Sequence, residues 1–328
     1  MWLKPMLRPK NQMLENTQSL LPVAPAGKML EVLSVGLDDE SLDELSRLLT
    51  TLGVRPMARM IIQPRSIHPG TYVGKGKIEE IKAQLEARSS HAVILDVDLS
   101  PNQLKNLEEA IGKPVLDRQG VIIEIFSRHA RTKESKTQVE LAKLQYLLPR
   151  LMHFWTHFER QRGGIGNKGM GEKQIEVDRR LVKTRMSVLR ARLKDIEKER
   201  DVQRAGRKDV LKVALVGYTN AGKSTLLNAL TESRVLAEDK LFATLDASVR
   251  ALDPDCHPPV VAIDTVGFIS NLPPGLVASF RSTLEELHQA DLLLHVVDAS
   301  ASQAKEQMEV TEKVLAELGV GDKPKLVV

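Results

Sequence analysis

Residues 217–224 read Gly-Tyr-Thr-Asn-Ala-Gly-Lys-Ser, and this stretch decides the fold around it. The aliphatic run 213–216 before it predicts a buried strand, and residues 225–230 after it have helical composition. A glycine-bounded turn between a strand and a helix directs backbone N–H groups and a helix N-terminus at one point, which is an anion site. Lys223 can neutralise phosphate charge, and the Ser224 hydroxyl can ligate Mg²⁺. The strand–loop–helix context argues against a chance match and predicts a nucleoside triphosphate site.

A second motif strengthens this prediction. Residues 264–267 read Asp-Thr-Val-Gly and close a predicted strand at 260–263. Asp264 at the end of a strand can hold Mg²⁺ through water, and a glycine three residues later lets a backbone N–H approach a γ-phosphate. Thr244, between the two motifs, is a candidate second Mg²⁺ ligand. An isolated Asp-x-x-Gly is common in turns, but the three features in this order are typical of a switch-type GTPase.

The predicted site residues follow from these motifs. The nucleotide-binding residues are Gly217, Tyr218, Thr219, Asn220, Ala221, Gly222, Lys223, Ser224, Thr225, Phe242, Ala243, Thr244, Asp264, Thr265, Val266 and Gly267. The metal ligands are Ser224, Thr244 and Asp264, and the catalytic residues are Lys223, Thr244 and Gly267. Phe268 stands where Ras-like proteins carry the Gln that orients the attacking water, so we expect slow intrinsic hydrolysis. Asn220 resembles the Asn by which some related GTPases hold K⁺, so the expected cofactors are Mg²⁺ and K⁺.

The pattern of elements predicts an α/β fold class: an N-terminal parallel α/β domain, an antiparallel helical hairpin and an incomplete C-terminal P-loop GTPase domain. Strands at 292–298 and 325–328 continue the last domain. In the first domain the predicted strands are 30–35, 57–62, 92–97 and 115–116, and the predicted helices are 40–52, 75–88, 101–111 and 119–128. The expected boundaries are a flexible tail at 1–27, the α/β domain at 28–130, the hairpin at 131–208 and the GTPase domain at 209–328.

The base-reading part of a GTPase does not follow in this sequence. Residues 325–328 are the type of strand after which a GTPase places Asn-Lys-x-Asp, whose Asp accepts hydrogen bonds from guanine. Two alternatives stay open: a truncated fragment, or a chain without the guanine site. The residues present predict phosphate and metal binding, not the choice of base.

Positive charge is concentrated in one part of the chain. Residues 150–208 hold 17 Lys and Arg against 8 Asp and Glu, a net of +9, whereas the whole chain is +4. The stretch from Arg179 to Arg192 contains no acidic residue. A basic stripe on one element indicates a polyanionic partner. A solvated helix with internal ion pairs is the plain alternative, and it fits only the later part near Asp195.

Apolar residues recur at helical spacing on either side of a glycine-rich loop. They are Leu141, Leu144, Leu148 and Leu151 before the loop, and Val182, Met186, Leu189, Leu193 and Ile196 after it. This spacing predicts two helices with coiled-coil-type seams. Five glycines within residues 163–171 exceed what a turn needs, and the flanking basic residues indicate ordering on a phosphate-rich partner. A flexible linker is the alternative. The predicted RNA-binding residues are Arg160, Arg162, Gly163, Gly164, Gly166, Lys168, Arg179, Arg180, Lys183 and Arg185.

Composition is consistent with a cytoplasmic protein of two or three domains. The single cysteine, Cys256, excludes internal disulfides and thiolate clusters. No apolar run approaches the roughly 18 residues of a membrane span. The tail carries no acidic residue before Glu15, which leaves an organellar transit peptide as an alternative. A monomer is the expected state.

The segment Gly74-Lys75-Gly76-Lys77 opens a predicted helix. It is an ordinary helix start or a weak anion site.

Several strings in this order resemble the HflX family of ribosome-associated GTPases. They are QVELAKLQYLLPRL, RQRGGIGNKGMGEKQIEVDRR, GYTNAGKSTLLNAL, FATLD and DTVGFI. The resemblance runs from about residue 29 to the last residue. Met170 and Lys173 depart from it, because the family usually shows Pro and Thr there.

The resemblance implies an N-terminal α/β domain, a helical hairpin and a G domain. It also implies binding to the large ribosomal subunit, with the hairpin loop near the peptidyl-transferase centre, and GTP-dependent rescue or splitting of stalled or idle ribosomes. Two alternatives remain at this stage: a ribosomal-RNA-binding module without nucleotide turnover, and an ATP-using RNA-remodelling protein.

Overall fold

The structure is a computed structural model. It describes residues 19–22, 29–63, 67–151, 168–205, 210–231, 241–242, 244–245, 248–253, 257–270 and 286–328, with backbone only for 168–175, 200–205 and 253. The chain divides into two compact units. One comprises Met1–Glu124 and Leu148–Lys183, and the other Ile125–Leu147 and Thr184–Val328. The domain boundaries expected at residues 28, 131 and 209 stay a prediction.

The first unit contains a four-stranded parallel sheet with the strand order β2-β1-β3-β4. Its elements are β1 (Glu31–Gly36), α2 (Asp39–Thr51), β2 (Arg55–Ile61), α3 (Lys75–Ala87), β3 (Ala92–Leu95), α4 (Pro101–Ile111) and β4 (Val115–Asp117). The strict alternation of strand and helix makes every connection a crossover, which is why the strands run parallel. The predicted parallel α/β domain is confirmed, with its strands and helices within a few residues of the expected positions.

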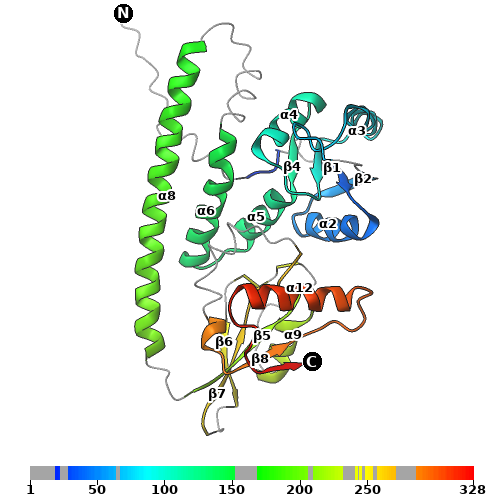
Figure 1. Ribbon diagram of the computed structural model, residues 1–328. Helices are drawn as coiled ribbons and strands as arrows, with labels where there is room; N and C mark the ends of the chain where they lie inside the picture. Colours follow the sequence, from blue (N-terminus) through cyan, green and yellow to red (C-terminus); the bar gives the residue numbers. More distant parts are fainter. Residues whose placement is uncertain are drawn as a thin grey trace, which may run out of the picture. The chain divides into compact units, whose positions relative to one another are not determined.

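Alternate residues of each strand serve opposite faces of this sheet, because strand side chains alternate with a period of two. Leu33, Val35, Val93 and Leu95 belong to a buried cluster with the apolar faces of α3 and α4. The four leucines of α2 at positions 42, 45, 48 and 49 are fully buried as well. Figure 1 shows α3 and α4 on one side of the strands and α2 on the other. The sheet is therefore covered on both faces.

Two local features set the edges of α4. Ser100 and Gln103 form a capping box at its start, where Pro101 occupies the first turn and has no N–H to leave unpaired. Gly112 ends the helix with φ +75°, a left-handed conformation that favours glycine.

The helix predicted at 119–128 is also confirmed, as α5 (Arg118–His129). Its β-branched residues are tolerated because Val121, Ile122 and Ile125 are fully buried.

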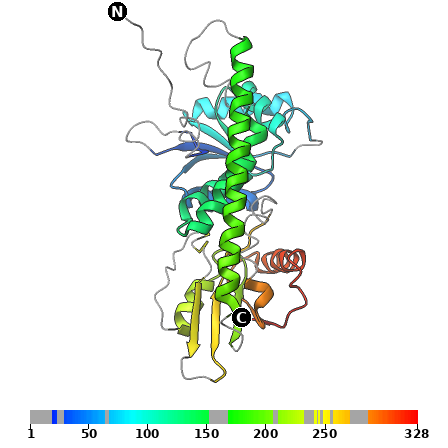
Figure 2. The same ribbon diagram turned by 90° about the vertical axis from the view of Figure 1, so that its left-hand side faces the viewer.

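The predicted hairpin region contains α6 (Lys133–Leu147), the 3₁₀ turn η1 (Leu148–Arg150) and the long α8 (Lys168–Ala205), which Figure 2 shows as one continuous helix. The seam expected through Leu151 is interrupted by this 3₁₀ turn, because Pro149 lacks the N–H that a continuous α-helical ladder needs. α6 is buried on nearly all sides rather than along one stripe. Arg185 of α8 donates two hydrogen bonds to Glu140 of α6, so these helices pair at that level.

The second unit contains a five-stranded sheet of order β6-β7-β5-β8-β9. Its elements are β5 (Leu211–Val216), α9 (Lys223–Thr231), β6 (Ser248–Asp253), β7 (Val260–Asp264), β8 (Leu292–His295), α12 (Ala304–Glu317) and β9 (Lys325–Val327). All neighbours are parallel except β6, which pairs antiparallel with β7. The predicted P-loop domain, with a mostly parallel sheet, is confirmed.

Two elements differ from the expectation. β6 was not predicted from the sequence, and the strand expected at 292–298 ends at His295. The reason for the early end is the neighbour: His295 pairs with Val216, the last residue of β5, and the next residue there is Gly217. Beyond this point the β5 side has turned into the phosphate-type loop, so the ladder stops.

Candidate functional site

The loop 217–222 joins the central strand β5 to α9, whose first residue is Lys223. Gly217 has φ +150°, and an added Cβ would lie 2.3 Å from the Val296 carbonyl oxygen, so only glycine fits. Asn220 has φ +62°, a left-handed conformation that Asn tolerates better than most residues. Both positive-φ residues lie in the turn that joins β5 to α9. The predicted strand–loop–helix is therefore present, with the helix N-terminus at the loop.

Lys223 is buried, with 5% of its surface exposed. Its ammonium donates to the carbonyl oxygens of Gly217 at 3.1 Å and Tyr218 at 2.7 Å. Burial lowers the pKa of Lys223 to about 8, and the nearby Asp264 carboxylate opposes this effect. The side chain is thus held at the inner side of the loop, where its charge is incompletely compensated.

Three oxygen groups from different elements meet beside this lysine. The Ser224 hydroxyl lies 2.6 Å from Asp264 Oδ2 and 2.7 Å from Thr244 Oγ1. Burial raises the pKa of Asp264, while the Ser224 hydrogen bond and the Lys223 charge lower it. Asp264 Oδ1 is buried without a hydrogen-bond partner among the described residues. Two hydroxyls and a carboxylate with a spare buried oxygen fit a hard divalent cation such as Mg²⁺.

The segment around Thr244 is anchored by Phe242, which has φ +58° although it is not glycine. Its N–H donates to Thr219 Oγ1 at 2.8 Å. Its ring meets Phe126 of α5 edge to face, with centroids 4.6 Å apart and an interplanar angle of 87°. Both rings are almost completely buried and belong to the same compact unit. A left-handed, non-glycine residue persists only where its surroundings hold it, and these contacts supply that restraint.

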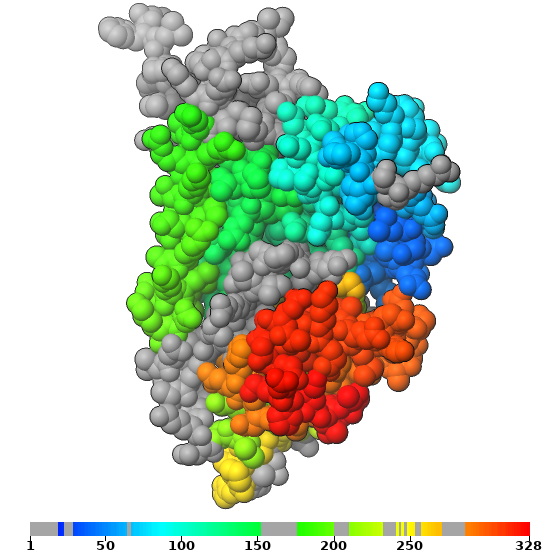
Figure 3. Space-filling view, viewed as in Figure 1, coloured from blue at the N-terminus to red at the C-terminus, as the bar shows by residue number. Residues whose placement is uncertain are grey.

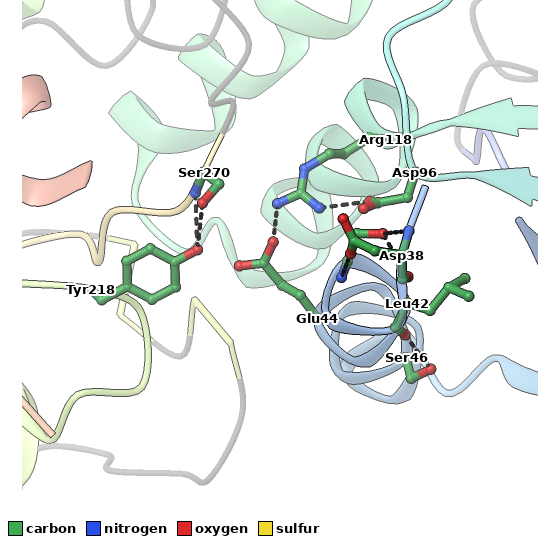
Figure 4. Close-up of polar contacts among 9 residues, drawn as sticks. Asp38, Leu42, Glu44, Ser46, Asp96, Arg118, Tyr218 and Ser270 are labelled. Atoms are coloured by element: carbon green, nitrogen blue, oxygen red, sulfur yellow. Dashed lines mark hydrogen bonds and ion pairs between the residues drawn. The ribbon is translucent and has the colours of Figure 1, made fainter. Parts of the chain in front are cut away.

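The segment after β7 is bound to the phosphate-type loop by its backbone. Phe268 N–H donates to the Gly217 carbonyl at 3.0 Å, and Thr219 N–H donates to the Phe268 carbonyl at 2.6 Å. The Tyr218 hydroxyl lies 3.0 Å from Ser270 Oγ and accepts from the Ser270 N–H at 3.0 Å. Figure 4 shows the Tyr218 hydroxyl directed at Ser270. Tyr218 belongs to the site predicted from the sequence and Ser270 does not, because no local pattern marks a hydroxyl 52 residues away.

Several predicted nucleotide-binding residues use their side chains for contacts within the protein. Thr219 accepts from Phe242, and Thr265 Oγ1 donates to the Leu215 carbonyl at 2.6 Å. Thr225 is exposed on α9. The structure brings Lys223, Ser224, Thr244, Asp264 and Gly267 to one place, and Ala243 lies outside the described residues. Their assignment to a bound nucleotide stays a prediction.

The predicted RNA-binding residues fall into three groups. Residues 152–167, with their arginines and glycines, lie outside the described part of the chain, and only the backbone of Lys168 is described. Arg179, Arg180 and Lys183 are exposed on α8, the green helix at the surface in Figure 3. Arg185 is half-buried in its bidentate ion pair with Glu140, which gives it a role in joining α8 to α6. Its contact with RNA stays a prediction.

A buried charge cluster in the first unit was not foreseen. Arg118, at the carboxyl edge of the sheet, binds Asp96 at 2.6 Å and also Glu44 (Figure 4). Arg150 reaches Asp117 at 3.1 Å and the Leu99 carbonyl at 2.9 Å. The opposite charges compensate one another, so the cluster ties α2, β3, β4 and η1 together.

In the Gly-Lys-Gly-Lys segment, Lys77 pairs with Glu80 at the start of α3.

Fold and site together define a P-loop nucleotide-binding protein of the switch type. Residues 39–127 match the family described as GTP-binding GTPase N-terminal, and 129–207 the GTP-binding GTPase Middle Region. Residues 212–328 match the 50S ribosome-binding GTPase family. Among the described residues no helix is both long and apolar enough to cross a membrane.

Similar proteins agree with these matches. GTPase HflX of Caldanaerobacter subterraneus is 45% identical over 300 residues, which cover 91% of this chain and 70% of that protein. GTPase HflX of Lacrimispora saccharolytica is 47% identical over 300 residues, covering 90% and 71%. The crystal structure of SsGBP in complex with GDP has a TM-score of 0.51 and 28% identity, covering 90% of this chain and 81% of that one. The chain belongs to the HflX family of GTPases.

Proposed function

We propose that this GTPase binds Mg²⁺–GTP at the loop 217–224, associates with the large ribosomal subunit and rescues or splits stalled or idle ribosomes. The observation that carries the nucleotide site is the convergence of Ser224, Thr244 and Asp264 within hydrogen-bond distance, beside the buried Lys223. These groups come from three separate segments, and phosphate and metal chemistry explains why they meet.

Each residue has a distinct task in this proposal. Lys223 neutralises phosphate charge in a site where burial makes that charge costly. Ser224, Thr244 and Asp264 would hold Mg²⁺, which when bound offsets charge on the phosphate oxygens. Asn220 would hold K⁺ beside them. The backbone N–H of Gly267 would face the terminal phosphate. The position of residues 267–270 would then depend on whether the terminal phosphate is present.

The side chain of Phe268 cannot orient a water molecule, and it is buried, with 2% of its surface exposed. The chain therefore lacks, at this position, the group that Ras-like proteins use for water attack. We propose that the ribosome supplies a catalytic group or orders the segment, which makes hydrolysis depend on ribosome contact.

Two observations support a ribosomal partner. The family matched by residues 212–328 is described as a 50S ribosome-binding GTPase. Arg179, Arg180 and Lys183 project from α8 without burial, as phosphate-contacting residues must. In the proposal, α8 and the glycine-rich segment contact ribosomal RNA, and the second unit reports the nucleotide state.

Co-sedimentation with purified large subunits tests the proposal. The chain should pellet with subunits in the presence of a non-hydrolysable GTP analogue and less with GDP. Replacement of Arg179, Arg180 and Lys183 by Ala should reduce pelleting, whereas replacement of the exposed Arg47, Lys75 and Arg88 by Ala removes the same charge elsewhere and should not. Pelleting that ignores nucleotide would favour an RNA-binding module without turnover. A preference for ATP would favour an RNA-remodelling protein, and no pelleting would refute the ribosomal assignment.

A further inference from the structure

The segment 267–270 lies in close contact with the phosphate loop. A Cβ added to Gly267 would lie 2.5 Å from the Thr219 Cα and 2.9 Å from the Lys223 ammonium. The Gly267 backbone therefore packs directly against Thr219 of the loop, and the Lys223 ammonium lies beside it. A terminal phosphoryl group would contact both the lysine and the Gly267 N–H. The place available to it therefore depends on where the 267–270 segment is held.

The same segment also occupies a donor of the loop. Thr219 N–H donates to the Phe268 carbonyl at 2.6 Å, and Phe268 N–H returns a bond to Gly217 at 3.0 Å. These bonds form a short parallel bridge between Tyr218 and Phe268. Loop N–H groups are the donors that cradle phosphates in such sites. The bridge therefore engages one loop N–H group, that of Thr219, and holds the 267–270 segment against the loop.

The Tyr218 side chain binds Ser270, the last residue of the 267–270 segment. Its hydroxyl accepts from the Ser270 N–H and lies beside the Ser270 hydroxyl, both at 3.0 Å (Figure 4). Tyr218 is 8% exposed, so the bonds are made in a sheltered position. These two bonds hold residue 270, and with it the 267–270 segment, on the loop.

We propose that the Tyr218 hydroxyl is a latch that sets the preference between guanosine diphosphate and triphosphate. With the latch closed, the 267–270 segment stays bound to the loop and the site suits a diphosphate. A triphosphate must break the Tyr218–Ser270 bonds and the bridge before its terminal phosphate reaches Lys223. Tyr218 is thereby a positioning residue, and its hydroxyl lowers triphosphate affinity relative to diphosphate affinity. This inference rests on the proposed nucleotide site.

Nucleotide titrations of the full chain test the latch. The probes are fluorescent GDP and a fluorescent non-hydrolysable GTP analogue, both with Mg²⁺. Tyr218→Phe should raise the ratio of triphosphate to diphosphate affinity about three- to tenfold, the range that net hydrogen bonds contribute. Ser270→Ala should raise it less, because the Ser270 N–H still donates to Tyr218. Tyr72→Phe makes the same chemical change in the first unit and should leave the ratio as it is.

Hydrogen exchange of nucleotide-free protein supplies a second measurement that needs no ligand. Residues 265–270 should exchange faster in Tyr218→Phe than in the wild type, with the protection of β7 retained as evidence of folding. An unchanged or lowered affinity ratio with GDP binding intact would overturn the latch alone. Absence of any guanine-nucleotide binding to the wild type would instead overturn the proposed function, and the latch with it.

Discussion

Glu108 offers a sharp test of how burial controls stability in the first unit. It lies on α4 with 9% of its surface exposed, and its Oε1 accepts the Val115 N–H at 2.8 Å. Burial raises the pKa of Glu108 from 4.5 to about 7, and the Val115 hydrogen bond only partly opposes this. The carboxyl group is therefore protonated in the folded chain at a pH where the unfolded chain has released the proton.

The sign of the effect follows from proton linkage. Between pH 4.5 and about 7 the folded state binds more protons at Glu108 than the unfolded state does, so stability falls as pH rises. At about 1.4 kcal/mol for each pH unit, the loss between pH 5 and pH 8 is about 2–3 kcal/mol. Glu108→Gln keeps an acceptor for Val115 but cannot ionise. Its stability relative to the wild type should therefore rise by about 2–3 kcal/mol over this pH range.

Urea unfolding at pH 5 and pH 8 measures this difference, with hydrogen exchange of peptides across residues 92–117 as the reporter for this unit. The neighbouring Glu109 is exposed, so Glu109→Gln is the matched control and should show no comparable pH-dependent gain. An equal gain in both variants, or none in Glu108→Gln, would refute the argument from burial.

Three further predictions concern the second unit and α8. Burial lowers the pKa of Lys223 to about 8, so its charge is lost above that pH. Triphosphate affinity, measured by fluorescence titration, should therefore fall between pH 7 and pH 9. Lys223→Ala should abolish triphosphate binding altogether. Intrinsic GTP hydrolysis, measured by phosphate release, should be slow and should rise at least tenfold with ribosomes, since Phe268 cannot orient water; fast turnover that ribosomes leave unchanged would contradict this. Ribosome binding should weaken steeply with salt, and replacing Arg179, Arg180 and Lys183 by Ala should reduce the slope of log K against log salt by about two to three, whereas an unchanged slope would exclude phosphate contacts by these residues.

The order and type of most elements could be predicted because they depend on local chemistry. Gly217 and Lys223 mark the loop whatever surrounds them, and the periodicity of apolar residues marks the strands and helices of the first unit. The helix at α5 was predicted against its β-branched composition because its apolar residues recur on one face. The phosphate-type loop, Thr244 and Asp264 were named from sequence order alone, and the structure brings them within hydrogen-bond distance.

The tertiary structure decided the contacts between residues far apart in the chain. Arg185 belongs to a basic stripe in the sequence, yet it pairs with Glu140, 45 residues earlier. Phe126 against Phe242, and Tyr218 against Ser270, are pairs that no local pattern announces. β6 was missed because its antiparallel pairing with β7 sets it, not a strong apolar run of its own. Local propensity and periodicity act over a few residues, whereas these partners are selected by packing once the sheets have formed, and packing depends on the whole chain.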